Sequence, residues 1–285
     1  MRKERHWYLF VAPALGLFLL FILYPLAWNF YLSFTKSSLI KTTWVGLFQY
    51  VRIASDRTLL NALYNTLYLT FFNLLTQLPL ALLIATLLNE IKYARTPFRI
   101  IYFLPYVTSI VVAAIIWTYM FDPDEGIFNW FLRLLGFRGL LWLSHPSTSK
   151  LSVVIFNLWH WLGYQILIYL AGLQTIPPQL YEAAEMDGAN SLQKFSKITI
   201  PLLKPTTVFL VITGTIGGMQ TFQQIYMFGT AVGNPGRSIQ TVVAYIYESG
   251  WVLQHFGIGA TAAVLLFLII MAITVVNVKF LVREK

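Results

Sequence analysis

The sequence predicts an all-α integral membrane protein with six transmembrane helices, folded as a single domain over residues 1–285. Hydrophobic residues make up 58% of the chain and charged residues only 11%, whereas soluble proteins keep about a quarter of their residues charged. The apolar residues gather into six runs that reach the ~20 residues a membrane helix needs. Cysteine is absent, which excludes a disulfide framework, a thiolate metal site and a cysteine nucleophile.

The six apolar runs lie at about residues 7–34, 64–88, 100–121, 151–173, 206–228 and 256–280. The first run follows the basic start MRKER, as the apolar part of a signal peptide would. It is much longer than the ~7–15 apolar residues of a signal peptide, and no small-residue cleavage site ends it, so we interpret it as an uncleaved anchor. Pro13, Pro25, Pro79 and Pro105 lie within the runs or at their ends, where membrane helices tolerate kinks.

The distribution of lysine and arginine predicts the orientation. Twelve of these residues fall in the segments 1–6, 91–99, 174–205 and 281–285 with their flanks, and eight fall in the other loops, which are longer in total. Because cytoplasmic loops carry the excess of Lys and Arg, we expect both termini to be cytoplasmic. The net charge of +9 then indicates membrane topology, and we expect no binding to nucleic acid.

The sequence shows neither an ion-coupling group inside the apolar runs nor a motif for nucleotide hydrolysis. All Asp, Glu, Lys and Arg residues fall in loops or at the ends of runs, and His160 is the only histidine deep inside one. Secondary transporters usually couple to ions through intramembrane carboxylates, and the chain has no G-x-x-x-x-G-K-[ST] phosphate-binding loop. We therefore expect either a partner that supplies the energy or a passive pore. For a membrane enzyme, His145 with Asp122 or Asp124 is the only loose candidate for a catalytic group.

One compact charged segment, YEAAEMDGANSLQKFSKITIPLLKP, separates the fourth and fifth runs. Pro177 and Pro178 precede it, and proline suits the first turn of a new helix. We expect a short helix over residues 179–186, a turn at Asp187-Gly188 because glycine reaches positive φ without strain, and a second helix over about 190–199. We call residues 174–205 the charged loop. Its predicted helix–turn–helix shape on the cytoplasmic side is suited to docking a soluble partner.

The charged loop resembles the EAA loop of the membrane subunits of ATP-binding-cassette (ABC) importers, whose pattern is EAA-x3-G-x9-I-x-LP. The match consists of Glu182-Ala183-Ala184, Gly188 and the stretch ITIP at 198–201, in which Ile200 replaces the family's leucine. The resemblance implies a coupling helix that contacts an ATPase subunit. The residues that it assigns to this contact are Glu182, Ala183, Ala184, Asp187, Gly188, Ile198 and Pro201.

Further segments resemble the carbohydrate branch of this family. They are NTLYLT at 65–70, FLPYVTSIVVAAIIWTYMF at 103–121, GIFNW at 126–130 and the charged loop itself. The stretch TFQQIYMFGTAVGNPGRSIQTVVAYIYESGW is similar to the first of two paired permeases, as in the maltose and glycerol-3-phosphate systems, although Gly233-Asn234-Pro235 replaces the usual GGP. The resemblance implies the type I ABC importer transmembrane fold.

The same resemblance implies a function and a set of partners. The chain is expected to be a non-enzymatic permease subunit of an ATP-driven sugar importer in a bacterial or archaeal cytoplasmic membrane. Its expected partners are membrane lipid, a second homologous permease, two copies of an ABC ATPase and an extracytoplasmic sugar-binding protein. No cofactor is expected in this chain, because ATP and Mg would bind to the ATPase subunits. The alternatives are a permease for glycerol-3-phosphate or a similar polyol phosphate, which the absence of Lys and Arg from the runs disfavours, and more distantly a secondary transporter or a membrane enzyme.

Polar side chains in the fourth and fifth runs indicate a pathway for substrate. The fourth run carries them on one broad helical face, and the fifth has a polar cluster near one end; the resemblance to the maltose system adds a glycine. Uncharged amides, hydroxyls and aromatic rings suit a neutral, hydroxyl-rich ligand. The candidates are Asn157, His160, Trp161, Tyr164, Gln165, Gly218, Gln220, Thr221 and Gln224.

Simpler interpretations of these residues stay open. Polar side chains at such spacing also form hydrogen bonds between helices, and the G-x-x-x-G pair Gly214 and Gly218 is common in close helix packing. His160 fits a hydrogen-bonding wall residue better than a base or a metal ligand. Residues 128–143 indicate an interfacial helix that either anchors the chain or contacts the binding protein, and residues 229–255 indicate a similar contact or part of an outer gate.

Overall fold

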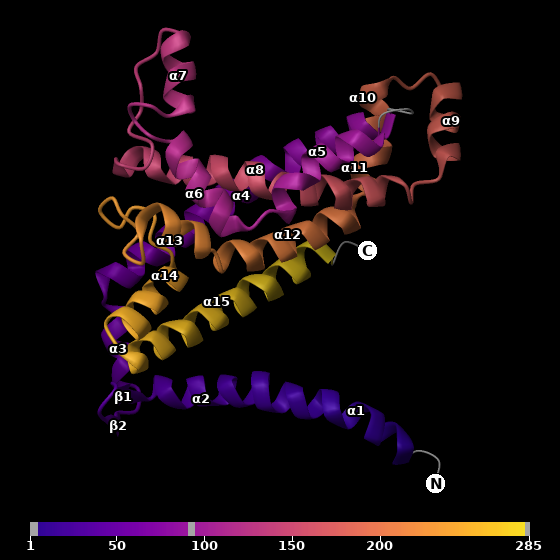
Figure 1. Ribbon diagram of the computed structural model, residues 1–285. Coiled ribbons are helices and arrows are strands. Elements are labelled where there is room, and N and C mark those ends of the chain that lie inside the picture. Colours follow the sequence, from indigo (N-terminus) through magenta and orange to yellow (C-terminus); the bar gives the residue numbers. More distant parts are fainter. Residues whose placement is uncertain (1–4, 91–94, 283–285) are drawn as a thin grey trace. The chain divides into compact units, whose positions relative to one another are not determined.

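The computed structural model describes residues 5–90 and 95–282, and nearly all of its regular structure is helical (Figure 1). Five basic residues that support the predicted orientation lie outside the described residues: Arg2, Lys3, Lys92, Arg283 and Lys285. The chain forms two compact units, Met1–Leu60 with Tyr245–Leu268, and Asn61–Ala244 with Ile269–Lys285. Each unit is described by itself below, and a single domain over residues 1–285 stays a prediction.

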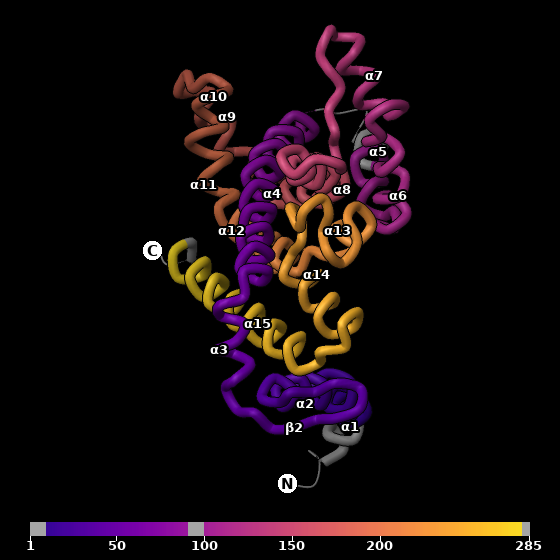
Figure 2. The backbone as a smooth tube through the Cα atoms, turned by 90° about the vertical axis from the view of Figure 1, so that its left-hand side faces the viewer, coloured from indigo at the N-terminus to yellow at the C-terminus, as the bar shows by residue number. Residues whose placement is uncertain are grey.

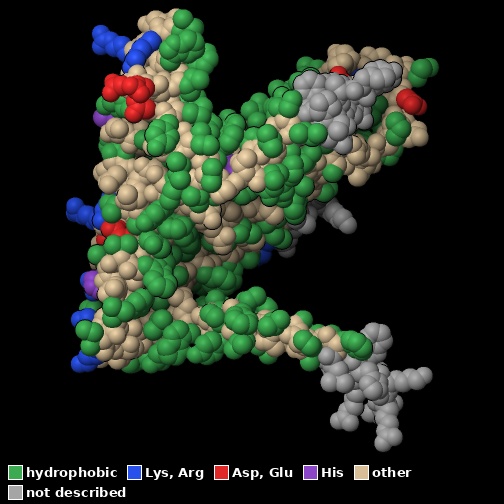
Figure 3. All heavy atoms as spheres, in the orientation of Figure 1, with side chains coloured by type: hydrophobic (Ala, Val, Ile, Leu, Met, Phe, Trp, Pro, Cys, Tyr) green, Lys and Arg blue, Asp and Glu red, His purple; other side chains and the backbone are tan. Residues whose placement is uncertain are grey.

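The first unit begins with a long apolar helical segment. It consists of α1 (Arg5–Phe18), the π-helical turn η1 (Leu19–Leu23) and α2 (Tyr24–Ser33). The most apolar 18 residues within Phe10–Ser33 have a mean hydropathy of 2.2, and none of them is buried within the chain. Figure 3 shows only hydrophobic and uncharged side chains along the visible part of this segment. This helix matches the first predicted run, and its surface suits hydrocarbon better than water.

A hairpin and a short helix complete the first part of this unit. Strand β1 (Thr35–Ser37) pairs antiparallel with β2 (Thr42–Trp44), and α3 (Phe48–Ala54) follows. The buried side chain of Gln49 donates from Nε2 to the Thr35 carbonyl at 3.3 Å. In the same unit, Thr261 Oγ1 donates to the Ser33 carbonyl at 3.0 Å. This bond joins two segments that are 228 residues apart in the sequence.

The second unit is built around three long helices, α4 (Arg57–Glu90), α8 (Pro146–Leu173) and α12 (Lys204–Met219), which lie side by side in Figures 1 and 2. Helix α4 is capped by Asp56, whose Oδ1 accepts from the Thr58 N–H. Helix α8 starts earlier than the predicted fourth run because His145 accepts from the Ser147 N–H and Pro146 occupies the first helical position. The last long helix, α15 (Phe256–Val282), runs through both units.

The core of the second unit has two parts. One part is aromatic, with Trp117, Phe121, Trp142 and Phe156 among its buried side chains. The other is mainly aliphatic and joins α4 and α8 to the end of the charged loop. Gly163 lies where α8 crosses α5 (Arg95–Val107), and a Cβ there would meet the backbone carbonyl of Tyr102. The absence of a side chain therefore sets how closely α5 approaches α8.

Two of the predicted runs are interrupted. The third run, expected as one helix over 100–121, consists of α5 and α6 (Ile110–Met120), which meet at 102°. Pro105 cannot donate its backbone nitrogen to the helical ladder, and Ser109 is extended at ψ 122°. The fifth run, expected over 206–228, ends as α12 at Met219 and resumes as α13 (Gln223–Gly229). These two expectations of unbroken helices are corrected.

The number of membrane spans depends on how the bent pairs are counted. Four helices are long and apolar enough to cross a bilayer: Phe10–Ser33, Arg57–Glu90, Pro146–Leu173 and Phe256–Phe280. The pair α5–α6, and the pair Ser191–Leu202 with Lys204–Met219, which meet at 61°, bring the number to six within the described residues if each pair is one span. The predicted six runs are therefore all helical, and six complete crossings stay a prediction.

Candidate functional site

A cavity of about 280 Å³ lies inside the second unit, among α4, α5, α6, α8, α12 and α13. This volume is close to the lower end of the ~300–1,000 Å³ typical of ligand sites. None of the residues that line it carries a charge. We call it the polar cavity, because amide side chains make up much of its wall.

The polar cavity brings together eight of the nine residues that the sequence assigned to a substrate pathway. Helix α8 contributes four of them, and the others lie at the end of α12, in the short connection that follows it and at the start of α13. They are Asn157, Trp161, Tyr164, Gln165, Gly218, Gln220, Thr221 and Gln224. The ninth, His160, is buried outside the lining and stacks on Phe156 with ring centroids 5.8 Å apart. The role of these residues in transport stays a prediction.

Two amide pairs connect α8 to its neighbours at the cavity. Gln165 Nε2 donates to Gln77 Oε1 at 2.7 Å, and Gln224 Nε2 donates to Asn157 Oδ1 at 2.9 Å. All four side chains are buried. These four side chains therefore form hydrogen bonds between elements and also line the cavity. The two interpretations do not exclude one another.

An aromatic face forms another part of the wall. The Tyr106 ring stacks on the Tyr164 ring with centroids 5.0 Å apart, and it lies 5.5 Å from the Trp161 ring. Tyr106 belongs to the last turn of α5, just before the break at Thr108 and Ser109. The interruption of the third run therefore ends α5 beside the cavity, where the aromatic face is made.

Asn73, Gln77 and Tyr106 are among the lining residues that escaped the sequence-based assignment. Asn73 and Gln77 are one turn apart in the second apolar run, so their spacing already places them on one face. Polar residues inside a membrane helix usually face the interior of the bundle. That pattern could have identified the pair, whereas Tyr106 carries no comparable pattern.

Two of the three glycines of α12, Gly214 and Gly218, pack against α4. A Cβ at Gly218 would lie 2.8 Å from the Thr70 side chain, and one at Gly214 would lie 2.6 Å from the Leu74 side chain. Both glycines also line the cavity. Close helix packing is therefore a sufficient reason for glycine at these positions, as in other G-x-x-x-G contacts.

The charged loop has the helix–turn–helix form that its sequence predicts. Helix α9 (Pro178–Met186) starts on Pro178, and Gly188 follows it at φ 78°. The second arm consists of α10 (Ser191–Lys194), the π-helical turn η2 (Phe195–Thr199) and α11 (Ile200–Leu202). This arm leads through Leu203 directly into α12.

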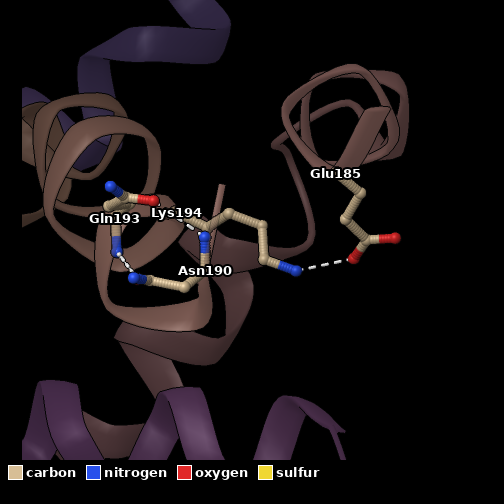
Figure 4. Close-up of polar contacts among 4 residues, drawn as sticks. All are labelled: Glu185, Asn190, Gln193 and Lys194. Atoms are coloured by element: carbon tan, nitrogen blue, oxygen red, sulfur yellow. Dashed lines mark hydrogen bonds and ion pairs between the residues drawn. The ribbon is translucent and has the colours of Figure 1, made fainter. Parts of the chain in front are cut away.

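Side-chain contacts fix the two arms of the loop to one another (Figure 4). Within the second arm, Asn190 and Gln193 form a capping box at the start of α10, with bonds of 2.8 and 2.9 Å. Lys194 Nζ pairs with Glu185 Oε1 at 2.6 Å, and the Tyr181 and Thr199 hydroxyls lie 2.9 Å apart. An exposed ion pair alone is worth little, so the turn and the capping box contribute most to the shape.

The residues assigned to ATPase contact lie on the accessible side of the charged loop. Ala184 and Ile198 are half-buried, and the other five are exposed: Glu182, Ala183, Asp187, Gly188 and Pro201. A shallow hollow of about 320 Å³ lies between the arms, lined in part by Ala184, Asp187, Gly188 and Ile198. The geometry thus leaves these residues accessible to a partner, and their contact with an ATPase stays a prediction.

The loose candidates for catalysis have structural roles in the described part of the chain. His145 caps α8. Asp122 Oδ1 accepts from the Asp124 and Glu125 N–H groups at 2.9 Å each, and these bonds hold the pKa of its carboxyl below the ordinary value. The described residues include no cluster of three or more His, Asp or Glu side chains suited to a metal.

The segment predicted as an interfacial helix over 128–143 is shorter in the structure. Helix α7 (Ile127–Leu134) ends before Gly136, which has φ 80°, and the chain then turns back. Buried Asn129 holds this turn: its Nδ2 donates to the Pro123 and Leu140 carbonyls, and its Oδ1 accepts from the Leu140 N–H and the Trp142 ring. Its role as an anchor or as a contact for a binding protein stays a prediction.

Comparison with known proteins gives one family. The model of the binding-protein-dependent transport system inner membrane component matches residues 77–284. The arabinooligosaccharides transport system permease protein AraP of Bacillus subtilis is 37% identical over 97% of this chain and 88% of its own length. The trehalose/maltose permease protein MalF of Thermococcus litoralis is 32% identical, over 98% and 94%. The sn-glycerol-3-phosphate permease protein UgpA of Agrobacterium fabrum is also 32% identical, over 97% and 94%.

A solved structure shows a similar fold. A chain of a bacterial ABC transporter that imports the acidic polysaccharide alginate superposes with a TM-score of 0.87 at 25% identity, over 99% of this chain and 97% of that one. A chain of the alginate transporter in complex with a pentasaccharide-bound periplasmic protein superposes with a TM-score of 0.86 at 23% identity, over 100% and 97%.

Proposed function

The chain belongs to the family of inner membrane components of binding-protein-dependent transport systems, and we propose that it is the permease subunit that passes a neutral sugar through an ATP-driven importer. The similarity to permease proteins over nearly the whole chain supports a sugar ABC importer permease in a multi-pass membrane location. The finer parts of the proposal are the substrate class, the pathway and the coupling. Each of them rests on a different part of the structure.

The uncharged wall of the polar cavity is the observation that carries the substrate class. Its amides and hydroxyl groups can donate to and accept from sugar hydroxyls, and its aromatic rings offer apolar faces. Relatives are named for the transport of neutral sugars, such as arabinooligosaccharides, trehalose or maltose, and lactose. Others are named for sn-glycerol-3-phosphate, but a phosphate would find no cation among the lining residues. A neutral sugar is therefore the better match.

The charged loop is the proposed point of coupling. Permeases of such importers act with a second permease, ATPase subunits and a binding protein. We propose that this chain pairs with one homologous permease and two copies of an ATPase, which bind ATP and Mg, on the cytoplasmic side. The two arms of the charged loop are fixed to one another, and the second arm continues into α12, which lines the cavity. Closure of an ATPase dimer against Glu182 and Gly188 would therefore move α12 and open the cavity to the binding protein.

Substitutions in the loop test this coupling. In the assembled importer, Glu182→Ala and Gly188→Asp should each lower the rate of ATP-driven sugar uptake at least about tenfold, which corresponds to a rise of ~1.4 kcal/mol in the activation free energy. The amount of chain in the membrane should stay unchanged. Glu125→Ala is the matched control, because Glu125 is exposed and lies outside the loop. Normal uptake by both loop variants would contradict the proposed coupling.

A further inference from the structure

The wall of the polar cavity on α4 has hydrogen-bond acceptors that lack donors. Asn73 and Gln77 lie one turn apart on α4, line the cavity and are only 8% and 4% exposed. Gln165 of α8 faces them and is 6% exposed. These three amides are more than nine-tenths buried, inside a helix bundle where polar groups are costly unless they are paired.

The hydrogen bonds available to the three amides do not satisfy them. Gln165 Nε2 donates to Gln77 Oε1 at 2.7 Å. Within the part of the chain that the structure describes, Asn73 Oδ1 and Gln165 Oε1 then have no hydrogen-bond partner. At the opposite side of the cavity, Asn157 and Gln224 pair with one another. Within the lining of the polar cavity, the buried acceptors without donors thus lie where α4 meets α8.

An unpaired amide oxygen requires a donor, which restricts the chemistry of a ligand. Each sugar hydroxyl offers an O–H donor, and the terminal torsion of an amide side chain is broad enough to turn its oxygen toward one. Phosphate, sulfonate and carboxylate groups are ionised at neutral pH and present acceptors, so they would place like partial charges together. The stacked rings of Tyr106 and Tyr164 line the same cavity and can receive the apolar face of a sugar ring.

On the basis of the proposed function, we propose that Asn73, Gln77 and Gln165 form a hydroxyl-binding site that selects neutral sugars during passage. Asn73 Oδ1 and Gln165 Oε1 accept from two sugar hydroxyls, and Gln77 holds Gln165 in place. Helix α4 is then a determinant of specificity, in addition to its packing against α12 through Thr70 and Leu74.

The test uses the complete importer, this chain with its second permease, ATPases and binding protein, in proteoliposomes. The probes are radiolabelled arabinotriose, maltose and lactose, and the readout is sugar taken up per ATP hydrolysed. Asn73→Leu and Asn73→Ala both remove the acceptor. Leucine keeps a side chain of similar size, whereas alanine is smaller and leaves the cavity larger. Both should lower uptake per ATP about tenfold while stimulation of the ATPase by loaded binding protein stays within about twofold. Thr76→Val is the control, because Thr76 lies on the same helix, outside the cavity lining, and bonds to the Phe72 carbonyl.

The outcomes separate this inference from the proposed function. Uptake per ATP that is unchanged in an assembled Asn73→Leu or Asn73→Ala importer would overturn the hydroxyl-binding site and leave the proposed function intact. An equal loss in Thr76→Val would also overturn it, because the effect would then belong to the helix as a whole. If the unaltered importer hydrolyses ATP but takes up none of the three sugars, the proposed function fails, and the inference fails with it.

Discussion

At the scale of single residues, Asp56 and Tyr245 form a pair on which pH can act. The Tyr245 hydroxyl donates to Asp56 Oδ2 at 2.7 Å, and both residues lie in the first unit. Burial raises the pKa of Asp56, but hydrogen bonds from Tyr245 and from the Thr58 and Leu59 backbone outweigh it, so the net pKa lies below the ordinary 3.8. Burial and the neighbouring Asp56 carboxylate together raise the pKa of Tyr245 above its ordinary value.

The direction of these shifts predicts how stability depends on pH. A lowered pKa means that the Asp56 contribution is complete above the ordinary value of 3.8 and is lost as pH falls below it. In Tyr245→Phe the carboxyl loses a donor and keeps its burial, so its folded-state pKa rises toward the ordinary value and acidification removes less stability than in the unaltered chain. Melting temperatures of the purified protein from about pH 6 to about pH 3 measure this.

Tyr50→Phe is the matched control for that experiment, because the Tyr50 hydroxyl lies 2.7 Å from Ser33 Oγ and bonds to no carboxylate among the residues that the structure describes. It should lower the melting temperature by the same amount at every pH. A pH profile that is identical in Tyr245→Phe and the unaltered chain would show that the Asp56 contact does not contribute to stability.

At the scale of the elements, the contact between α5 and α8 depends on one missing side chain. A methyl group at Gly163 would meet the Tyr102 backbone carbonyl, which cannot turn aside as a flexible side chain could. Gly163→Ala should therefore destabilise the protein by about 1–3 kcal/mol, the usual cost of an overpacked core. Thermal melting in detergent checks this.

Gly217→Ala provides the comparison, since a Cβ at Gly217 of α12 meets no atom within 4 Å. Alanine is favoured over glycine inside helices by up to about 1 kcal/mol, so this variant should be at least as stable as the unaltered chain. Equal stability of both variants would mean that α5 can move away from α8 without cost, contrary to the packing described here.

The sequence predicts the elements better than it predicts their interruptions. Run length identifies the apolar helices, and Pro178 and Gly188 are local signals that predict the first helix and the turn of the charged loop. The break after Val107 is different, because Pro105 is compatible with either a kinked or a broken helix. Pro105 alone does not decide between them, and the stacking of Tyr106 on Tyr164, which accompanies the broken form, joins segments far apart in the sequence.

The same limit applies to the candidate site. Asn157, Tyr164 and Gln165 could be placed on one face because they share a helix. Their meeting with Asn73 and Gln77 of α4 is a tertiary contact across 88 residues in the case of the bonded glutamines, and helical spacing alone does not say which faces meet. The polar residues could thus be found one helix at a time, while the cavity that they form could not.

At the scale of the whole molecule, the apolar surface and the uncharged cavity belong to a protein that works within a membrane and with partners. The segment from Phe10 to Ser33 has no charged residue, and none of its most apolar part is buried within the chain. The sequence of the chain contains no phosphate-binding loop for ATP. The proposed source of energy for transport is an ATPase subunit, and the charged loop is the surface proposed to receive it.

The most direct test of this account is gentle purification of the chain from its native membrane, with mass spectrometry of whatever remains bound. The account predicts a second permease with a similar number of spans and an ATPase with a phosphate-binding loop. Combining Glu182→Ala and Gly188→Asp in the charged loop should reduce the amount of bound ATPase and leave the second permease bound. Recovery of the chain alone, repeatedly and in several mild detergents, would contradict its assignment as a subunit of an ATP-driven importer.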